Sequence, residues 1–194
     1  LAAIAQKKAA AAAQAEADKQ AAVTVGEVWA AYMKARRPYW GECHHADHAR
    51  MVQAGGVPAL RGIKGGGLTK PQPLYPFMAL ALRDLTTPTI EAWAAREAKT
   101  RPTSARLSWR CLKAFLSWCE EQPEYVGVLP EKNAAKSKKA REALGKPGIK
   151  QDALLREQLP VWFAAVRAIG NPVTAAYLQT LLLTGARPGE VLGL

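Results

Sequence analysis

The residues best suited to chemistry lie near position 187, where an apolar run meets a glycine turn and an arginine. The run at 181–184 is followed by Gly185, Arg187 and Pro188, an order that predicts one helix ending and another beginning. Arg187 would then stand beside the free N–H groups of the new helix, and its guanidinium offers a planar fork of donors. Glu190, one turn along, could orient it. The expected ligand is a phosphate, held rigidly between packed apolar residues. The alternative is an arginine that only pairs with Glu190 or with local carbonyls.

The charge balance points to a polyanionic partner. The 194 residues contain 27 Lys and Arg against 16 Asp and Glu, a net charge of +11, which favours nucleic acid or an anionic membrane surface. The longest uncharged run lies between Arg167 and Arg187 and is interrupted by Gly170 and Pro172. This favours a buried helix with a break at its start over a bilayer span. The expected partner is therefore double-stranded DNA, with no membrane association.

A helix expected over residues 103–121 carries two opposed stripes. The apolar stripe is Leu112, Phe115, Leu116 and Cys119, and the basic stripe is Arg106, Arg110 and Lys113. At about 100° per residue the two stripes lie on roughly opposite faces. One face therefore packs, while the other presents three cations in line, as contacts to a DNA backbone require. A solvated face without a partner is the alternative.

Residues 127–150 are expected to form a flexible basic linker between two domains. The segment has seven cations and only two acids, with prolines and glycines around it and few apolar residues. Such a tether suits a protein that wraps a duplex. The cations expected to contact DNA are Lys136, Lys138, Lys139 and Arg141. The alternative is a solvated linker that binds nothing.

The rest of the chain has helical periodicity and no convincing strand pattern, so the expected fold class is all-α. Capping signals and apolar spacing predict helices over 24–35, 43–53, 76–83 and 156–168, and from Thr87 and Asn171 onward. Residues 1–22 contain twelve alanines and predict a further helix. Glycines and prolines over 55–75 predict a long loop or insertion, which lacks the spacing of a phosphate-binding loop.

Histidine and cysteine supply one candidate ligand cluster. All three histidines follow Cys43 within six residues, and His44 and His48 have the i, i+4 spacing that can bind zinc on a helix. No complete ligand set is visible, so we expect surface polar residues near DNA and no metal. Tyr39 and Trp40, beside two arginines, suit either core packing or nucleic-acid contact. The odd cysteine count argues against a disulfide scaffold and favours a reducing compartment.

Two segments resemble a known family. The run from Leu181 to Leu194, Leu-Leu-Leu-Thr-Gly-Ala-Arg-Pro-Gly-Glu-Val-Leu-Gly-Leu, resembles the first arginine box of the tyrosine recombinases, the phage integrase family. The stretch from Ser104 to Pro130 resembles the end of that family's core-binding domain, with its Leu-x-x-Phe-x-x-Trp pattern ending at Trp118. The alanine-rich start resembles the helix that joins an N-terminal arm-binding domain to the core-binding domain.

The resemblance implies an all-α chain of four parts. These are a connector helix over 1–22 from a missing arm-binding domain, a helical (SAM-like) core-binding domain over 23–126 with an insertion at 55–75, the basic linker over 127–150, and the first helices of a truncated catalytic domain over 151–194.

The resemblance also implies a chemistry. Family members cut and rejoin DNA through a 3′-phosphotyrosine intermediate without a metal. Arg187 matches the arginine that binds the scissile phosphate and stabilises its transition-state charge, and Glu190 matches a supporting glutamate. The second arginine box, the lysine and the nucleophilic tyrosine lie further along in the family. We therefore expect these 194 residues to bind DNA without cutting it.

For the intact protein, the resemblance implies a site-specific recombinase that needs no small-molecule cofactor and forms a multimer on DNA. The expected location is the cytoplasm of a bacterium, with a bacterial or phage gene and association with the nucleoid when bound. Two alternatives remain on the residues alone. One is a non-catalytic helical DNA-binding or architectural protein, and the other is an interaction module whose basic surface meets an acidic protein.

Overall fold

The computed structural model describes residues 23–59, 67–130, 133–149 and 153–193. Within these ranges the regular structure is helical, and extended pairing is limited to two isolated bridges, Thr24 with Ala81 and Pro58 with Leu68. The expected all-α fold class is therefore confirmed. The connector helix expected over 1–22 lies outside the described residues.

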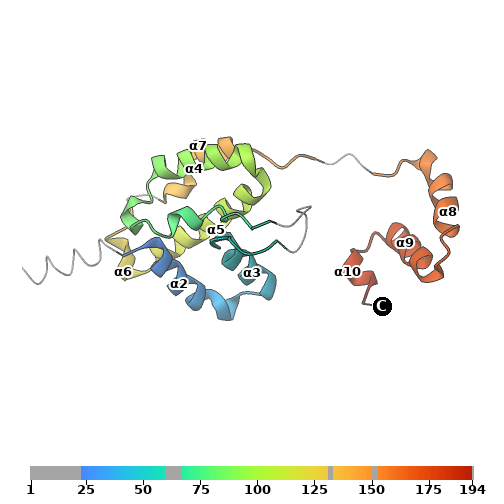
Figure 1. Ribbon diagram of the computed structural model, residues 1–194, viewed down its shortest axis with the longest axis horizontal. Helices are drawn as coiled ribbons and strands as arrows, with labels where there is room; N and C mark the ends of the chain where they lie inside the picture. The colour runs from blue at the N-terminus through green and yellow to red at the C-terminus, as the bar shows by residue number, and fades with distance from the viewer. Residues whose placement is uncertain (1–22, 60–66, 131–132, 150–152, 194) are drawn as a thin grey trace, which may run out of the picture. The chain divides into compact units, whose positions relative to one another are not determined.

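The chain divides into two compact units, Leu1–Pro147 and Gly148–Leu194 (Figure 1). The α-helices described in the first unit are α2 (Val25–Arg36), α3 (Glu42–Met51), α4 (Thr87–Thr100), α5 (Pro102–Glu120), α6 (Pro123–Val126) and α7 (Lys138–Leu144). Its 3-10 turns are η1 (Arg37–Tyr39), η2 (Tyr75–Phe77), η3 (Leu82–Asp84) and η4 (Ala134–Lys136). The bounds of α2, α3 and α5 agree with the sequence prediction to within two residues.

The core of the first unit forms where α2, α3, α4 and α5 present their apolar faces to one another. α2 is capped by Thr24, whose hydroxyl accepts the N–H of Glu27, while the Glu27 carboxylate accepts the N–H of Thr24 at 2.8 Å. This is the predicted capping box. Trp29, Trp93 and Phe115 are buried, and the Trp29 and Phe115 rings lie 5.0 Å apart. The apolar stripe of α5 is buried as its periodicity predicts.

The prediction of a short helix over 76–83 is wrong. The segment forms two 3-10 turns, η2 and η3, because its backbone is used in tertiary hydrogen bonds instead. The carbonyls of Met78 and Leu80 accept the N–H groups of Gly26 and Val25, and the N–H of Leu82 donates to Val23. These bonds satisfy free donors at the start of α2, which an isolated helix would leave to water.

The flexible linker predicted over 127–150 is also corrected by the structure. Its described residues include η4 and α7, which belong to the first unit, and α7 packs along α4. Four of its apolar residues are buried: Ala134, Ala135, Ala140 and Leu144. Periodicity gave a weak signal because three of the four are alanines, which bury little area each but allow close packing. The boundary between the two units falls at Pro147–Gly148.

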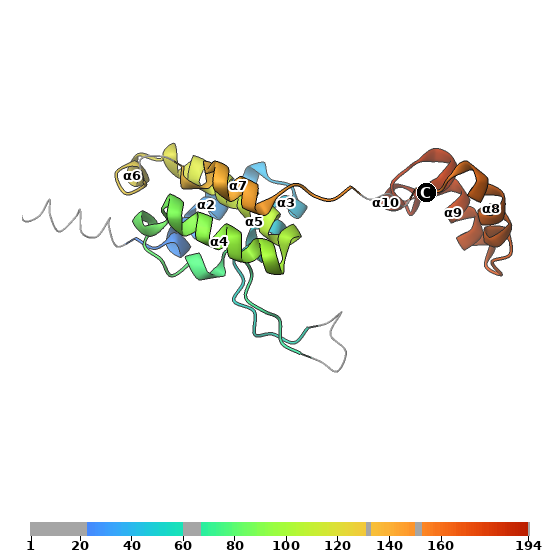
Figure 2. The same ribbon diagram turned by 90° about the horizontal axis from the view of Figure 1, so that it is seen from above.

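The predicted insertion over 55–75 contains an extended arm. Its two described segments, residues 53–59 and 67–72, pair in antiparallel directions through the Pro58–Leu68 bridge and project from the helical body (Figure 2). Gly55 and Gly56 have φ of 75° and 79°. A Cβ on Gly55 would lie 2.5 Å from the Thr69 carbonyl oxygen, so the close approach of the two segments requires glycine there.

The second unit contains η5 (Arg156–Gln158), α8 (Leu159–Arg167), α9 (Pro172–Thr184) and α10 (Pro188–Val191). Asn171 caps α9 as predicted, since its side chain accepts the N–H groups of Val173 and Thr174 at 2.9 and 3.3 Å. The prediction that this helix is buried is wrong for its described residues, among which only Ala175 is buried. No described helix is both long and apolar enough to cross a membrane.

Candidate nucleic-acid interface

Arg187 lies between a glycine turn and a new helix, as its spacing predicts. Gly185 ends α9 with φ of 65°, and its N–H donates to the Leu181 carbonyl at 3.0 Å. The N–H of Ala186 donates to the Thr184 hydroxyl at 3.2 Å. Arg187 follows at once and precedes α10. The bend is therefore held by its own hydrogen bonds rather than by distant packing.

The guanidinium of Arg187 is directed to solvent. Its side chain is 88% exposed, and Nη1 lies 3.6 Å from Glu190 Oε1. Glu190 Oε2 accepts the backbone N–H of Arg187 at 2.8 Å. One carboxylate thus holds both the backbone and the guanidinium. Because an exposed ion pair contributes little stability, most of the arginine's donors remain available to an anion.

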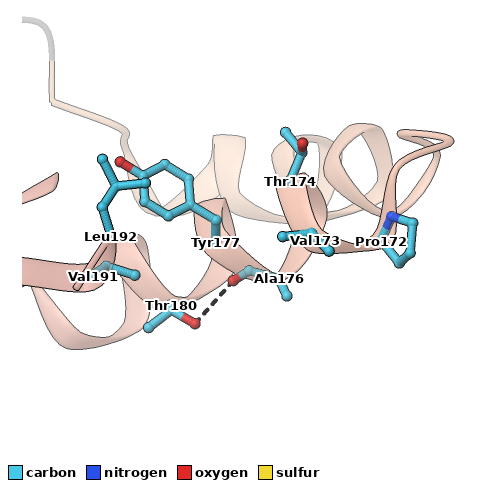
Figure 3. A pocket seen from close by; sticks show the side chains of 8 residues that line it. All are labelled: Pro172, Val173, Thr174, Ala176, Tyr177, Thr180, Val191 and Leu192. Atoms are coloured by element: carbon cyan, nitrogen blue, oxygen red, sulfur yellow. Dashed lines mark hydrogen bonds between the residues drawn. The ribbon is translucent and has the colours of Figure 1, made fainter. Parts of the chain in front are cut away.

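The packed apolar residues expected on both sides of Arg187 are not found in the described part of the chain. Leu183 and Leu192 are largely exposed. The apolar side chains instead line an open groove of about 860 Å³ formed by α9 and α10, with Val173 and Tyr177 on its α9 wall (Figure 3). Apolar spacing identified residues able to be buried, but it could not identify what covers them.

The basic stripe of α5 is present, but its three cations have different surroundings. Arg106 donates to the Leu144 carbonyl at 3.2 Å and to the Thr103 hydroxyl at 3.3 Å. The Lys113 ammonium lies 3.9 Å from the centre of the Trp109 ring, a cation–π contact. Arg110 is exposed, and no carboxylate within the described ranges pairs with it. Arg110 is therefore the cation of this stripe with the most donors free.

The four candidate cations from the predicted linker lie on η4 and α7. Lys136 pairs with Glu120 at 3.5 Å, Lys138 with Glu142 at 3.7 Å, and Lys139 with Glu91 at 3.3 Å. All three lysines are well exposed, so these pairs are weak and a phosphate can displace the carboxylate. Arg141 is exposed and forms no ion pair with any described carboxylate.

Two residues without a recognisable sequence signal, Asn133 and Trp109, hold this surface together. Asn133 donates to the Lys113 carbonyl at 3.3 Å and to the Ser117 hydroxyl at 3.1 Å. The indole of Trp109 donates to the Ala135 carbonyl at 2.8 Å. Through these bonds the basic stripe of α5 and the lysines of η4 and α7 belong to one folded unit. Only the tertiary structure reveals the pairing, since 20 and 26 residues separate the partners.

The histidine cluster is only partly at the surface. His44 is exposed, but His48 is buried, so its assignment to the surface was wrong. His48 Nδ1 lies 3.0 Å from the His44 carbonyl, which accepts only, so Nδ1 carries the proton. Nε2 then accepts from the Tyr32 hydroxyl at 3.4 Å. Burial lowers the pKa of His48 and raises the pKa of Tyr32.

Tyr39 and Trp40, the aromatic pair between α2 and α3, have different surroundings: one packs on the core and the other lies at the surface. Trp40 packs on the core, with its ring 5.1 Å from that of Tyr32. Tyr39 is exposed, and the Arg36 guanidinium lies 5.1 Å from its ring centre. Tyr39 thus presents an aromatic face beside a cation at the surface, an arrangement that suits contact with nucleic acid.

Across the described ranges, no group of three or more His, Cys, Asp or Glu side chains is placed to hold a metal ion. Cys43 is exposed and unpaired, whereas Cys111 and Cys119 are free and buried. Burial raises the pKa of the Cys111 thiol to about 11 and that of Cys119 to about 12. The two buried thiols therefore pack as small apolar groups.

These features describe an all-helical protein with a basic surface on its first unit and an exposed arginine at a helix start in its second. A family model described as phage integrase core-binding domain matches residues 24–142. The chain therefore belongs to the phage integrase family.

A curated relative agrees with this assignment. The chain is 37% identical over 182 residues to prophage integrase IntF of Escherichia coli (strain K12). The aligned region covers 89% of this chain and 38% of that protein, so the chain spans well under half the length of the relative. No solved structure matches the chain.

Proposed function

We propose that this chain is the DNA-binding part of a site-specific recombinase that cuts and rejoins DNA through a 3′-phosphotyrosine intermediate. The observation that carries the proposal is the match of residues 24–142 to the core-binding domain, followed by the arginine box around Arg187 in its expected turn. We place the core-binding domain in the first unit, with its end moved from 126 to Pro147, and the start of the catalytic domain after it. Residues 1–22 would be the connector from an arm-binding domain.

In this proposal Arg187 is the catalytic arginine that binds the scissile phosphate. Its exposed guanidinium is free to donate two parallel hydrogen bonds to phosphate oxygens. Glu190 is the positioning residue, because its carboxylate holds both the backbone N–H and the side chain of Arg187. Arg187 would stabilise charge that develops on the phosphate in the transition state.

Binding to the DNA backbone would be carried by the cations of α5, η4 and α7: Arg106, Arg110, Lys113, Lys136, Lys138, Lys139 and Arg141. Arg110 and Arg141 are the strongest candidates, since neither has an ion-pair partner among the described carboxylates. Arg106 would contribute less, because two of its donors hold Leu144 and Thr103.

We further propose that these 194 residues bind duplex DNA without cutting it. In the second unit Arg187 has only Glu190 as a charged neighbour among the described residues, whereas phosphotransfer needs several cations and a tyrosine around one phosphate. Tyr177, the tyrosine of this unit, donates its hydroxyl to the Pro188 carbonyl at 3.4 Å. The intact protein would act as a multimer on DNA, in the cytoplasm and at the nucleoid, with no metal or small-molecule cofactor.

A binding titration tests the proposal. Duplex DNA is titrated with the chain at several salt concentrations, and we expect affinity to fall steeply as salt rises because each phosphate contact releases counterions. Replacing Arg110 with Ala should reduce the slope of log affinity against log salt by about 1. Lys99→Ala is the control, since Lys99 is an exposed cation of α4 that this proposal does not use. Absence of binding at low salt would refute the proposal, and a covalent protein–DNA adduct would refute the claim that the chain does not cut.

A further inference from the structure

The extended arm of residues 53–59 and 67–72 is not explained by the proposed function. Its two segments pair through three hydrogen bonds: Gly56 N–H to Thr69 O, Thr69 N–H to Val57 O, and Ala59 N–H to Gly67 O, each 2.8 Å. The Thr69 hydroxyl also accepts the N–H of Val57 at 3.3 Å. The arm thus continues as an ordered ribbon beyond the helices, in the direction that Figure 2 shows. A two-stranded ribbon is marginally stable by itself, so its direction must be fixed at the base.

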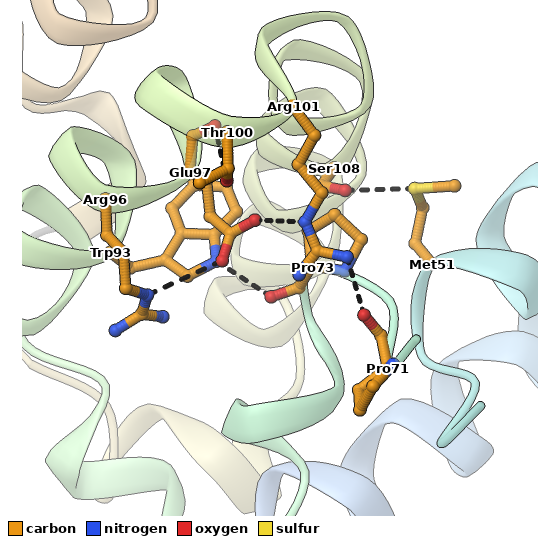
Figure 4. Close-up of polar contacts among 9 residues, drawn as sticks. All are labelled: Met51, Pro71, Pro73, Trp93, Arg96, Glu97, Thr100, Arg101 and Ser108. Atoms are coloured by element: carbon orange, nitrogen blue, oxygen red, sulfur yellow. Dashed lines mark hydrogen bonds and ion pairs between the residues drawn. The ribbon is translucent and has the colours of Figure 1, made fainter. Parts of the chain in front are cut away.

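The base of the arm is fixed by buried polar groups from α4 and its C-terminal end (Figure 4). The indole of Trp93 donates to the Pro73 carbonyl at 2.8 Å, and the Arg101 guanidinium donates to the Pro71 carbonyl at 2.6 Å. Arg101 is itself held by the carboxylate of Glu97, whose side chain is only 5% exposed. Two backbone bonds, Gln72 to Gln53 and Leu74 to Met51, close the base.

This anchoring is costly and specific. Removing a carboxylate such as Glu97 from water is unfavourable unless a partner compensates for it. Here the main compensation comes from Arg101, which donates through Nε to Glu97 and through Nη1 to the Pro71 carbonyl of the arm. A loop that only connects two helices needs no buried ion pair and no side-chain hydrogen bonds of this kind at its base. The network therefore serves to hold the arm at a defined angle to the body.

The charge of this part of the chain selects the kind of partner. Between His48 and Arg83 the sequence has no Asp or Glu, while it has four cations: Arg50, Arg61, Lys64 and Lys70. In the described part of the arm Lys70 is exposed, and Val57 and Leu68 are 60% and 64% exposed. A projecting ribbon without carboxylates fits a polyanion, and the major groove of DNA admits a two-stranded ribbon.

We infer that the arm is a second DNA contact, which lies against the duplex beside the segment bound by the helical body. The inference rests on the proposed function. Lys70 contacts the phosphate backbone, and the exposed apolar side chains of Val57 and Leu68 lie against sugars or base edges. The hydrogen-bond network of Glu97, Arg101 and Trp93 positions the arm.

The test is to shorten the arm at the hydrogen-bonded pair of Gly56 and Thr69. Residues 57–68 are replaced by Asn-Gly, which closes a two-residue hairpin between Gly56 and Thr69. The helical body and the base of the arm are unchanged, and an unaltered thermal unfolding midpoint checks this. Affinity for duplexes of increasing length and the hydroxyl-radical footprint are then measured. We expect the footprint to shorten at one end and affinity for long duplexes to fall about tenfold.

Single substitutions keep the inference testable if the shortened chain fails to fold. Lys70→Ala should lower the salt slope by about 1 and remove protection at the same end of the footprint. Lys34→Ala, which removes an exposed cation of α2 outside the arm, should leave that end protected. If the unaltered chain binds DNA but both arm variants keep its full footprint and affinity, the inference is wrong and the proposed function stands. If the unaltered chain does not bind at low salt, both fail.

Discussion

The two units of this chain differ in how far they bury their own apolar residues. In the described part of the first unit, 22 apolar residues form one buried cluster, which includes three of the aromatic side chains of α2 and α5. In the described part of the second unit only Val166 and Ala175 are buried, and Val161, Val173, Leu183 and Leu192 remain largely exposed. The comparison shows that both units form helices, but only the first covers its own apolar residues.

The difference has a physical reason. Forty to fifty residues bury too small a fraction of their surface to outweigh the entropy of ordering the chain. The first unit is long enough to surround α5 with α2, α3, α4 and α7. The second, Gly148–Leu194, has local capping by Asn171 and a glycine turn, which define its helices without creating a core.

The largest expected effect comes from truncating one matched pair of apolar side chains. Phe115→Ala in α5 removes a ring with no exposed surface and should lower the free energy of unfolding by about 3–5 kcal/mol. Leu183→Ala in α9, which is 73% exposed, should change it by less than about 0.5 kcal/mol. Urea unfolding followed by circular dichroism measures both. Equal destabilisation by the two variants would mean that the second unit has a core of its own.

A smaller effect is expected at the base of the arm. Arg101→Ala leaves Glu97 buried with only the weaker contact to Arg96 at 3.5 Å, and should cost about 2 kcal/mol because a buried charge loses its main partner. Arg83→Ala is the control, since Arg83 is exposed and only 4.0 Å from exposed Asp84. Its cost should stay below about 0.5 kcal/mol. The same unfolding experiment measures both variants. Equal losses in the free energy of unfolding would contradict the role of Arg101 at the base of the arm.

The smallest effect is expected from pH, and only in the first unit. Burial lowers the pKa of folded His48 below its ordinary value of 6.5. The unfolded state therefore takes up a proton more readily than the folded state. The contribution of His48 to the free energy of unfolding should be fully present above about pH 6.5 and should fall as pH drops below it. Thermal unfolding between pH 8 and pH 5 measures this. His48→Gln should flatten the dependence, and an unchanged slope in that variant would show that another group causes it.

The parts predicted correctly from sequence are those governed by local rules. The capping box at Thr24, the cap at Asn171, the turn at Gly185 and the two faces of α5 each depend on residues within one or two helical turns. The errors occur where distant segments compete for the same groups. Residues 76–83 give up a helix to bond the start of α2, and residues 133–144 pack on α4 and α5 although their composition resembles a linker.

The order of residues by itself determined the helical class, the family resemblance, the basic character and the bend that carries Arg187, because charge, periodicity and turn chemistry are properties of neighbours along the chain. Only the tertiary structure decided which cations have no ion-pair partner among the described residues, that His48 is buried, and that Trp93 and Arg101 hold the base of the arm by hydrogen bonds. The burial of His48 and the anchoring of the arm depend on contacts between residues 16 to 30 positions apart, and no local pattern encodes which of several possible partners a buried polar group will meet.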